Sequence, residues 1–280
     1  MGLFDDGQFV KVRISTQDRG GEIVGNFENK VIIITGATSG LGATAAISLA
    51  SKGAKVAITG RREEQGQAVV KQIQAAGGEG MFIKTDVKVR NDLEAMVAKT
   101  VDRFGRLDGA VNNAGITPGV FTPVADIIED DWHDTISTNL NAVFMSMKFE
   151  IPAMLASGGG SIVNISSMYG LIGGDIGNAA YVTSKWGVIG LTKTAAIDYG
   201  DKGIRVNALC PGYCHSEMVD PYVEAEPAMF EKIISRHSAM NRLGESQEVA
   251  DAIEWLLSDQ SSFVNGAAVP IEGGETTRLY

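Results

Sequence analysis

From residue 30 to residue 42 the chain reads KVIIITGATSGLG, a strand pattern that runs directly into a glycine-rich turn. The first six letters form an uninterrupted apolar, β-branched run, as expected of a strand that is buried on both faces of a sheet. Glycines follow at positions 36, 40 and 42, and the Ala-rich segment 41–51 is predicted to be a helix. This succession of strand, glycine turn and helix is typical of the first unit of a doubly wound α/β sheet.

The same alternation of strand and helix patterns continues to the end of the chain. Because strands that alternate with helices pair in parallel through right-handed crossovers, we expect one α/β domain with helices on both faces of a sheet. The expected strands are 30–35, 54–59, 80–85, 107–111, 161–165, 204–209 and 267–271, and the expected helices are 41–51, 63–76, 91–104, 132–156, 181–199 and 248–257.

Two segments do not fit this alternation. Residues 1–29 precede the first strand, and their pattern fits either a weak β-hairpin or a frayed terminus. Residues 213–242 interrupt the last helix–strand unit and contain several Met, Tyr and Phe residues. An insertion of this size is usually a lid, a binding loop or a partner surface, so we expect a substrate lid at about 213–242.

The overall composition excludes several classes of protein. The 280 residues are 44% hydrophobic and 21% charged, which indicates a globular chain. Lys and Arg number 24 against 34 Asp and Glu, and this acidic balance argues against nucleic acid or anionic membranes as partners. No apolar run approaches the roughly 18–20 residues of a membrane span. Two cysteines, Cys210 and Cys214, are too few for a disulfide framework and suggest reduced thiols in a cytoplasmic protein.

The glycine turn is a candidate site for the phosphates of a dinucleotide. Its glycines are spaced i, i+4 and i+6 rather than as GxGxxG, but they serve the same purposes of a tight turn and close backbone approach. The helix N-terminus behind the turn offers free N–H groups and a partial positive charge. The alternative is a plain strand–helix turn. The residues expected at the coenzyme are Gly36, Thr38, Ser39, Gly40, Leu41 and Gly42.

The end of the second expected strand bears on which coenzyme binds. Dinucleotide folds that bind NAD(H) often have an acid at this point, about 20 residues beyond the glycines. Here Arg61 and Arg62 follow the strand, and guanidinium groups bind phosphate well. We therefore favour NADP(H) over NAD(H), although both arginines are also compatible with a solvated helix start.

Tyr181 and Lys185 are candidates for proton-transfer chemistry. Their i, i+4 spacing places the phenol and the ammonium on one face of a helix. A free phenol has a pKa near 10, and a neighbouring ammonium favours the phenolate. The pair alone often arises by chance, but Ser166 and Ser167 end the fifth expected strand, where ligands bind in open α/β sheets.

With these motifs in place, the sequence resembles the short-chain dehydrogenase/reductase family, of the single-domain type. The resemblance covers about residues 28–275 and implies a Rossmann-type, doubly wound parallel sheet of seven strands in the order 3-2-1-4-5-6-7. Residues 30–280 would form its dinucleotide-binding catalytic domain. The matching segments are TGATSGLG at 35–42, DV at 86–87, NNAG at 112–115, NLNAVF from 139, SIVNISS at 161–167, YVTSK at 181–185, IRVNALCPG at 204–212 and IEGG at 271–274.

The resemblance also implies a catalytic tetrad. Tyr181 would be the acid/base, and Lys185 would lower its pKa and bind the nicotinamide ribose. Ser167 would hydrogen-bond the reacting oxygen, and Asn139 would hold a water that connects Lys185 to solvent. The other coenzyme-binding residues that it implies are Asp86, Val87, Asn113, Gly115, Pro211, Gly212 and Ser216.

Two departures from the family pattern leave alternatives open. The interval from Ser167 to Tyr181 is one residue longer than usual, so Ser166 is a possible replacement for Ser167. Family members that prefer NADP often have a basic residue within the glycine turn, where this chain has Thr38 and Ser39. NAD(H) therefore stays an alternative coenzyme.

The sequence thus predicts an enzyme that interconverts a ketone or aldehyde and the corresponding alcohol. An NAD-dependent alcohol dehydrogenase is one alternative, and a non-catalytic dinucleotide-binding regulator is another. We expect no metal, because the three histidines are scattered. A small-molecule substrate is expected, as is a homodimer or homotetramer formed through the helix that contains Tyr181. The histidines in question are His133, His215 and His237.

Overall fold

The structure is a computed structural model that describes residues 27–174 and 177–277. The N-terminal segment 1–26, which contains most of the expected hairpin, lies outside the described residues.

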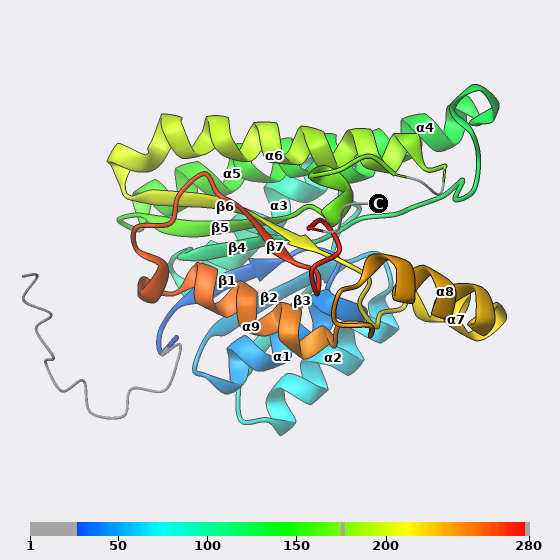
Figure 1. Ribbon diagram of the computed structural model, residues 1–280. Helices are drawn as coiled ribbons and strands as arrows, with labels where there is room; N and C mark the ends of the chain where they lie inside the picture. The colour runs from blue at the N-terminus through cyan, green and yellow to red at the C-terminus, as the bar shows by residue number, and fades with distance from the viewer. Residues whose placement is uncertain (1–26, 175–176, 278–280) are drawn as a thin grey trace, which may run out of the picture.

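The sheet has seven parallel strands in the order β3-β2-β1-β4-β5-β6-β7, which confirms the expected fold class (Figure 1). Each strand falls on an apolar run of the sequence. Their bounds are β1 Val31–Ile34, β2 Lys55–Gly60, β3 Glu79–Lys84, β4 Gly109–Asn112, β5 Gly160–Ile165, β6 Ile204–Pro211 and β7 Ala268–Ile271.

Helices cover both faces of this sheet. Helices α1, α2 and α9 lie on one face, and α3, α5 and α6 lie on the other (Figure 1). The helices on the first face are α1 Gly40–Ser51, α2 Glu63–Ala75 and α9 Ser246–Leu257. Those on the second face are α3 Arg90–Phe104, α5 Ala142–Ala156 and α6 Ala179–Tyr199, preceded by the short α4 Glu129–Ile136.

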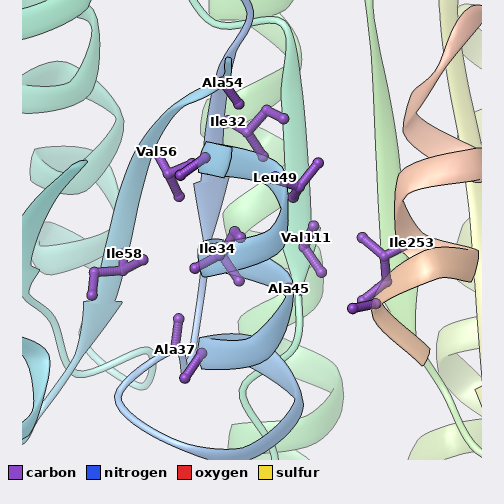
Figure 2. Packing of buried hydrophobic residues seen from close by; sticks show 14 of the residues in the cluster. Ile32, Ile34, Ala37, Ala45, Leu49, Ala54, Val56, Ile58, Val111 and Ile253 are labelled. Carbon is purple, nitrogen blue, oxygen red and sulfur yellow. The ribbon is translucent and has the colours of Figure 1, made fainter. Parts of the chain in front are cut away.

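Strand β1 shows why its sequence is apolar at every position. Ile32 and Ile34 point into the core shared with Leu49 of α1 and Ile253 of α9 (Figure 2). Ile33, between them, belongs to the core on the opposite face of the sheet. Because successive side chains of a strand point to opposite faces, a strand with helices on both sides needs an uninterrupted apolar run.

The expected helix 132–156 is interrupted. A π-helical turn, Ser137–Asn141, separates α4 from α5. A π turn adds one residue to a helical turn and is frequent at functional sites. Here it contains Asn139, whose side chain is fully buried.

The insertion at 213–242 forms two helices, α7 Asp220–Ala225 and α8 Pro227–His237, that stand beyond the carboxyl ends of the strands (Figure 1). The two ends of this excursion are joined to each other. The backbone N–H of Gly244 donates to the carbonyl of Tyr213 at 2.9 Å, and that of His215 donates to the carbonyl of Gly244 at 2.9 Å. The excursion therefore leaves and rejoins the domain at one place.

Candidate active site

A cavity of about 510 Å³ lies at the carboxyl ends of the strands, between the glycine turn and the α7–α8 excursion. Ligands of open α/β sheets bind at this edge. Most of the residues expected to bind coenzyme or substrate line this cavity, and Gly42 and Asn139 are the two that do not. The expected residues on its wall are Gly36, Thr38, Ser39, Gly40, Leu41, Arg61, Arg62, Asp86, Val87, Asn113, Gly115, Ser167, Tyr181, Lys185, Pro211, Gly212 and Ser216.

The glycine turn is packed too closely for larger residues. A Cβ on Gly36, which has φ +64°, would lie 2.7 Å from Cα of Ala114. A Cβ on Gly42 would lie 2.6 Å from Nδ2 of Asn113. That amide donates to the carbonyls of Thr35 and Gly36, each at 3.0 Å, and so ties β4 to the turn. Gly42 therefore supports the site from behind the cavity wall.

The first turn of α1 fits a dinucleotide pyrophosphate. Its N-cap residue, Ser39, makes no capping hydrogen bond with its side chain, and the turn contains no acidic residue. No acidic residue within this first turn therefore compensates the partial positive charge of the N–H groups at the helix N-terminus. An anion of the size of a pyrophosphate is the ligand that such a cradle suits.

Arg62 lines this cavity beside the glycine turn. Its guanidinium donates to Oγ1 of Thr38 at 3.0 Å and to Oγ of Ser39 at 2.6 Å. It also forms an ion pair with Glu217, at 2.5 Å from Nη1 to Oε1. The hydroxyl of Ser39 donates to the same carboxylate. Arg62 and Ser39 together lower the pKa of Glu217 to about 2.

Tyr181 and Lys185 face each other on α6, as their spacing predicts. Nζ of Lys185 lies 5.4 Å from the centre of the Tyr181 ring and donates to the backbone carbonyl of Ile165 at 2.8 Å. The Tyr181 hydroxyl is hydrogen-bonded to Ser167, at the end of β5. Two elements, β5 and α6, thus hold a phenol, a hydroxyl and an amine at one wall of the cavity.

Burial dominates the titration of this group. It raises the pKa of Tyr181, against the opposing hydrogen bond from Ser167. It lowers the pKa of Lys185 to about 8. The shift in the pKa of Tyr181 is opposite to the one expected from a neighbouring ammonium, because burial leaves the phenolate poorly solvated.

The two serines at the end of β5 have different partners. Oγ of Ser166 donates to the backbone carbonyl of Lys185 at 2.9 Å and is buried. Ser167 instead accepts the N–H of Tyr169 at 3.2 Å and contacts the Tyr181 hydroxyl. Of the two alternatives left open by the sequence, Ser167 is the one that faces Tyr181.

Asn139 lies behind the cavity wall. Its Oδ1 accepts the N–H of Ile116 at 2.9 Å, and its Nδ2 donates to the carbonyl of the same residue at 2.8 Å. Nδ2 also approaches Oγ of Ser184 at 3.3 Å. A Cβ added to Gly115 would lie 3.5 Å from Oδ1 of Asn139 and 3.6 Å from Nζ of Lys185, so the loop after β4 passes close to both.

The sequence analysis noted the Met, Tyr and Phe content of the excursion but did not single out Glu217 or Tyr169. The hydroxyls of Tyr169 and Tyr213 lie 2.8 Å apart, and the Tyr213 ring packs edge-on against Phe230 at 5.5 Å between ring centres. The Met, Tyr and Phe content of 213–242 was a signal for an apolar wall. No motif marks Glu217.

Two further searches cover the described ranges 27–174 and 177–277. In these ranges no group of three His, Cys, Asp or Glu side chains is placed to hold a metal ion. Every helix there is too short or too polar to cross a membrane. The thiols of Cys210 and Cys214 are buried, and burial raises their pKa to about 11 and about 12.

Known proteins of similar sequence and structure agree with this geometry. A family model described as enoyl-(acyl carrier protein) reductase matches residues 36–276. Cyclohexanol dehydrogenase of Acinetobacter sp. (strain SE19) is 43% identical over 253 residues, which cover 90% of this chain and 97% of that protein. Trans-4-hydroxycyclohexanecarboxylate dehydrogenase of Sinomonas cyclohexanicum is 42% identical over 253 residues, covering 88% and 93%. The crystal structure of levodione reductase matches with a TM-score of 0.85 and 35% identity, covering 90% of this chain and 100% of that one.

The fold and the similar proteins define an oxidoreductase that depends on NAD(H) or NADP(H) and acts on CH–OH and C=O groups. The chain belongs to the short-chain dehydrogenase/reductase family.

Proposed function

We propose that the protein interconverts a ketone or aldehyde and the corresponding alcohol, with Tyr181 as the acid/base. The observation that carries this proposal is the contact of the Tyr181 hydroxyl with Ser167 in the wall of the cavity. Nζ of Lys185 lies 5.4 Å from the centre of the Tyr181 ring. A regulator that only binds a dinucleotide needs no such arrangement of proton donors.

The bound coenzyme supplies or accepts the hydride. The chain's residues control the proton and the substrate oxygen. Ser167 holds the substrate oxygen beside the Tyr181 hydroxyl, which gives a proton to a carbonyl oxygen in reduction and accepts one from the alcohol in oxidation. The ammonium of Lys185, close to the ring, favours the phenolate that forms in reduction. Asn139 fixes the loop at Ile116 that passes behind Lys185.

The substrate that we propose is a partly apolar, cyclic secondary alcohol or ketone. The cavity wall also includes Tyr169, Met218, Tyr222 and Phe230, which offer apolar contact area with few charges. The similar dehydrogenases named for cyclohexanol and for trans-4-hydroxycyclohexanecarboxylate act on six-membered rings, and this supports the choice.

For the coenzyme, we propose NADP(H). Arg62 with the hydroxyls of Thr38 and Ser39, and Arg61 beside them on the cavity wall, form a donor set suited to a 2′-phosphate. NAD(H) is a second candidate, because the carboxylate of Glu217 pairs with Arg62.

A substrate-panel assay that follows the absorbance of the reduced nicotinamide, run with both coenzymes, tests this function. Turnover of cyclic ketones or alcohols is expected, with kcat lowered about 10²–10⁴-fold in Tyr181→Phe. Tyr199→Phe, at the far end of the same helix and outside the cavity lining, is the matched control. Undiminished turnover in Tyr181→Phe would exclude Tyr181 as the acid/base.

Arg62→Ala is expected to raise KM for NADP(H) more than KM for NAD(H).

We also propose that the protein is a homo-oligomer that pairs through α5 and α6. Phe144 on α5 and Trp186 and Ile197 on α6 are 49%, 51% and 81% exposed, which is high for large apolar side chains. Light scattering after gel filtration is expected to show a dimer or tetramer, and a lower mass for Ile197→Glu. Val124→Glu, at a comparably exposed position outside these helices, should leave the mass unchanged.

A further inference from the structure

The carboxylate of Glu217 occupies the donor set expected to bind a 2′-phosphate. Its Oε1 lies 2.5 Å from Nη1 of Arg62, and its Oε2 lies 2.8 Å from Nη2 and accepts the hydroxyl of Ser39. Glu217 belongs to the excursion between β6 and α9, whereas Arg62 and Ser39 belong to the glycine-turn side of the cavity. The contact therefore joins the two sides across the adenosine end of the site.

A carboxylate and a phosphate monoester compete for such donors. Each is an anion that accepts two parallel hydrogen bonds from a guanidinium and a further one from a hydroxyl. Because Arg62 and Ser39 hold the pKa of Glu217 at about 2, the carboxylate stays charged throughout the neutral range. A phosphate brought to Arg62 must therefore either displace Glu217 or lie beside a negative charge at contact distance.

We propose that Glu217 determines coenzyme specificity by occupying the 2′-phosphate position on Arg62, which weakens the binding of phosphorylated coenzyme and leaves the unphosphorylated one unaffected. The proposal rests on the coenzyme site of the proposed function and adds a competing residue to it. It also gives the reason why NAD(H) is the second candidate coenzyme, since Glu217 neutralises Arg62 when no phosphate is bound.

The position of Glu217 also links the coenzyme to the excursion. A Cβ on Gly40, in the glycine turn, would lie 3.8 Å from the backbone N of Glu217, so the excursion lies directly over the turn. Displacement of the Glu217 side chain by a phosphate removes an ion pair that holds the segment before α7 against Arg62. Binding of the phosphorylated coenzyme is thus opposed both by charge and by the loss of this contact.

Calorimetric binding of two half-coenzymes tests the proposal without requiring catalysis. The probes are 5′-AMP and adenosine 2′,5′-bisphosphate, titrated into the full chain and into Glu217→Gln. Gln keeps the size and the acceptor oxygen but loses the charge. We expect the bisphosphate to bind roughly tenfold more tightly to Glu217→Gln, with a change of less than about twofold for 5′-AMP. The gain in affinity for the bisphosphate should shrink at high salt, since the side chains of Arg62 and Glu217 are both exposed to solvent.

A matched control is Glu248→Gln. Glu248 forms a similar ion pair with Arg242, at 2.7 Å, and the cavity lining does not include Glu248. Its substitution should not change the ratio of the two dissociation constants. In an Arg62→Ala background, Glu217→Gln should change this ratio much less, because the guanidinium for which the carboxylate and the phosphate compete is gone. Thermal melts of each variant check that it is folded, and Glu217→Ala provides a second test.

Two results would overturn the proposal, and they differ from each other. If Glu217→Gln leaves the ratio of the dissociation constants unchanged, or tightens both ligands equally, Glu217 does not compete with the phosphate. If 5′-AMP binds to none of the variants, the dinucleotide site itself is wrongly placed, and the proposed function fails with it.

Discussion

The two adjacent serines at the end of β5 have different roles: Ser166 bonds to the backbone, and Ser167 contacts Tyr181. Ser167→Ala removes the hydroxyl beside Tyr181, so we expect kcat to fall by about 10²-fold or more with little change in coenzyme affinity. Ser166→Ala removes a hydrogen bond to the backbone of Lys185, at a cost of about 1 kcal/mol in unfolding free energy. Steady-state kinetics and chemical denaturation of both variants measure these effects. The reverse assignment would be required if Ser166→Ala lost activity and Ser167→Ala retained it.

Single residues also mark what the sequence could not reveal. The Tyr181 and Lys185 pair follows from helical spacing, because four residues bring two side chains to one face. The pairing of Arg62 with Glu217 joins residues 155 positions apart through the folded excursion, and nothing local in the sequence signals it. The raised pKa of Tyr181 likewise depends on its burial, which only the packed structure shows.

At the scale of elements, the fit of α1 against β4 depends on Gly42. A Cβ there would lie 2.6 Å from Nδ2 of Asn113 and 2.8 Å from the carbonyl of Gly36. Gly42→Ala must therefore push the helix N-terminus away from the turn, and we expect a loss of about 1–3 kcal/mol in unfolding free energy together with weaker coenzyme binding. Thr44→Ala, two residues along α1, is a control for which the change should stay within about 0.5 kcal/mol. Denaturation curves with and without coenzyme measure both quantities, and wild-type behaviour of Gly42→Ala would contradict the close packing.

The inner strands β1, β2 and β5 were predictable because they are buried on both faces of the sheet and are therefore largely apolar, whereas the edge strands β3 and β7 are only partly buried. All seven strands begin and end within two residues of the expected bounds. The π turn at Ser137–Asn141 was not predicted, because no Gly or Pro marks a break in the helical pattern there. The cavity lining followed from the strands, since the carboxyl ends of parallel strands meet at one edge of the sheet.

At the scale of the whole molecule, a buried acid lies between the helical layer and the sheet. Glu150 of α5 is 0% exposed, and its Oε2 accepts a hydrogen bond from Asn112 of β4 at 3.1 Å. Its other oxygen, Oε1, has no hydrogen-bond partner among the described residues. Burial raises the pKa of Glu150 to about 7, above its ordinary value of 4.5. The folded state therefore retains a proton that the unfolded chain loses at lower pH.

This difference gives stability a pH dependence of known sign. Between pH 4.5 and about 7 the folded state binds the additional proton, so the free energy of unfolding falls as the pH rises through this window, by up to about 3 kcal/mol for Glu150 alone. Glu275, whose pKa burial also raises to about 7, adds a contribution of the same sign. Glu150→Gln is uncharged at every pH, and we expect urea denaturation to show a flatter profile over this window. An equally steep profile in that variant would contradict the assignment to Glu150.

The paired ends of the excursion have a consequence for how such an enzyme acquires new specificities. Backbone hydrogen bonds join Tyr213 and His215 to Gly244, so both ends of the intervening segment are fixed at one place. We therefore expect that this segment can be replaced as a unit. Grafting the corresponding stretch of a relative between these two anchor points should transplant the shape of the substrate pocket while the sheet, the glycine turn and the proton-donating group keep their places. A donor segment that lacks an acid at position 217 would lose the bonds to Arg62 and Ser39, and a segment that packs differently would also lose the bond from the N–H of Met240 to the carbonyl of Gly273.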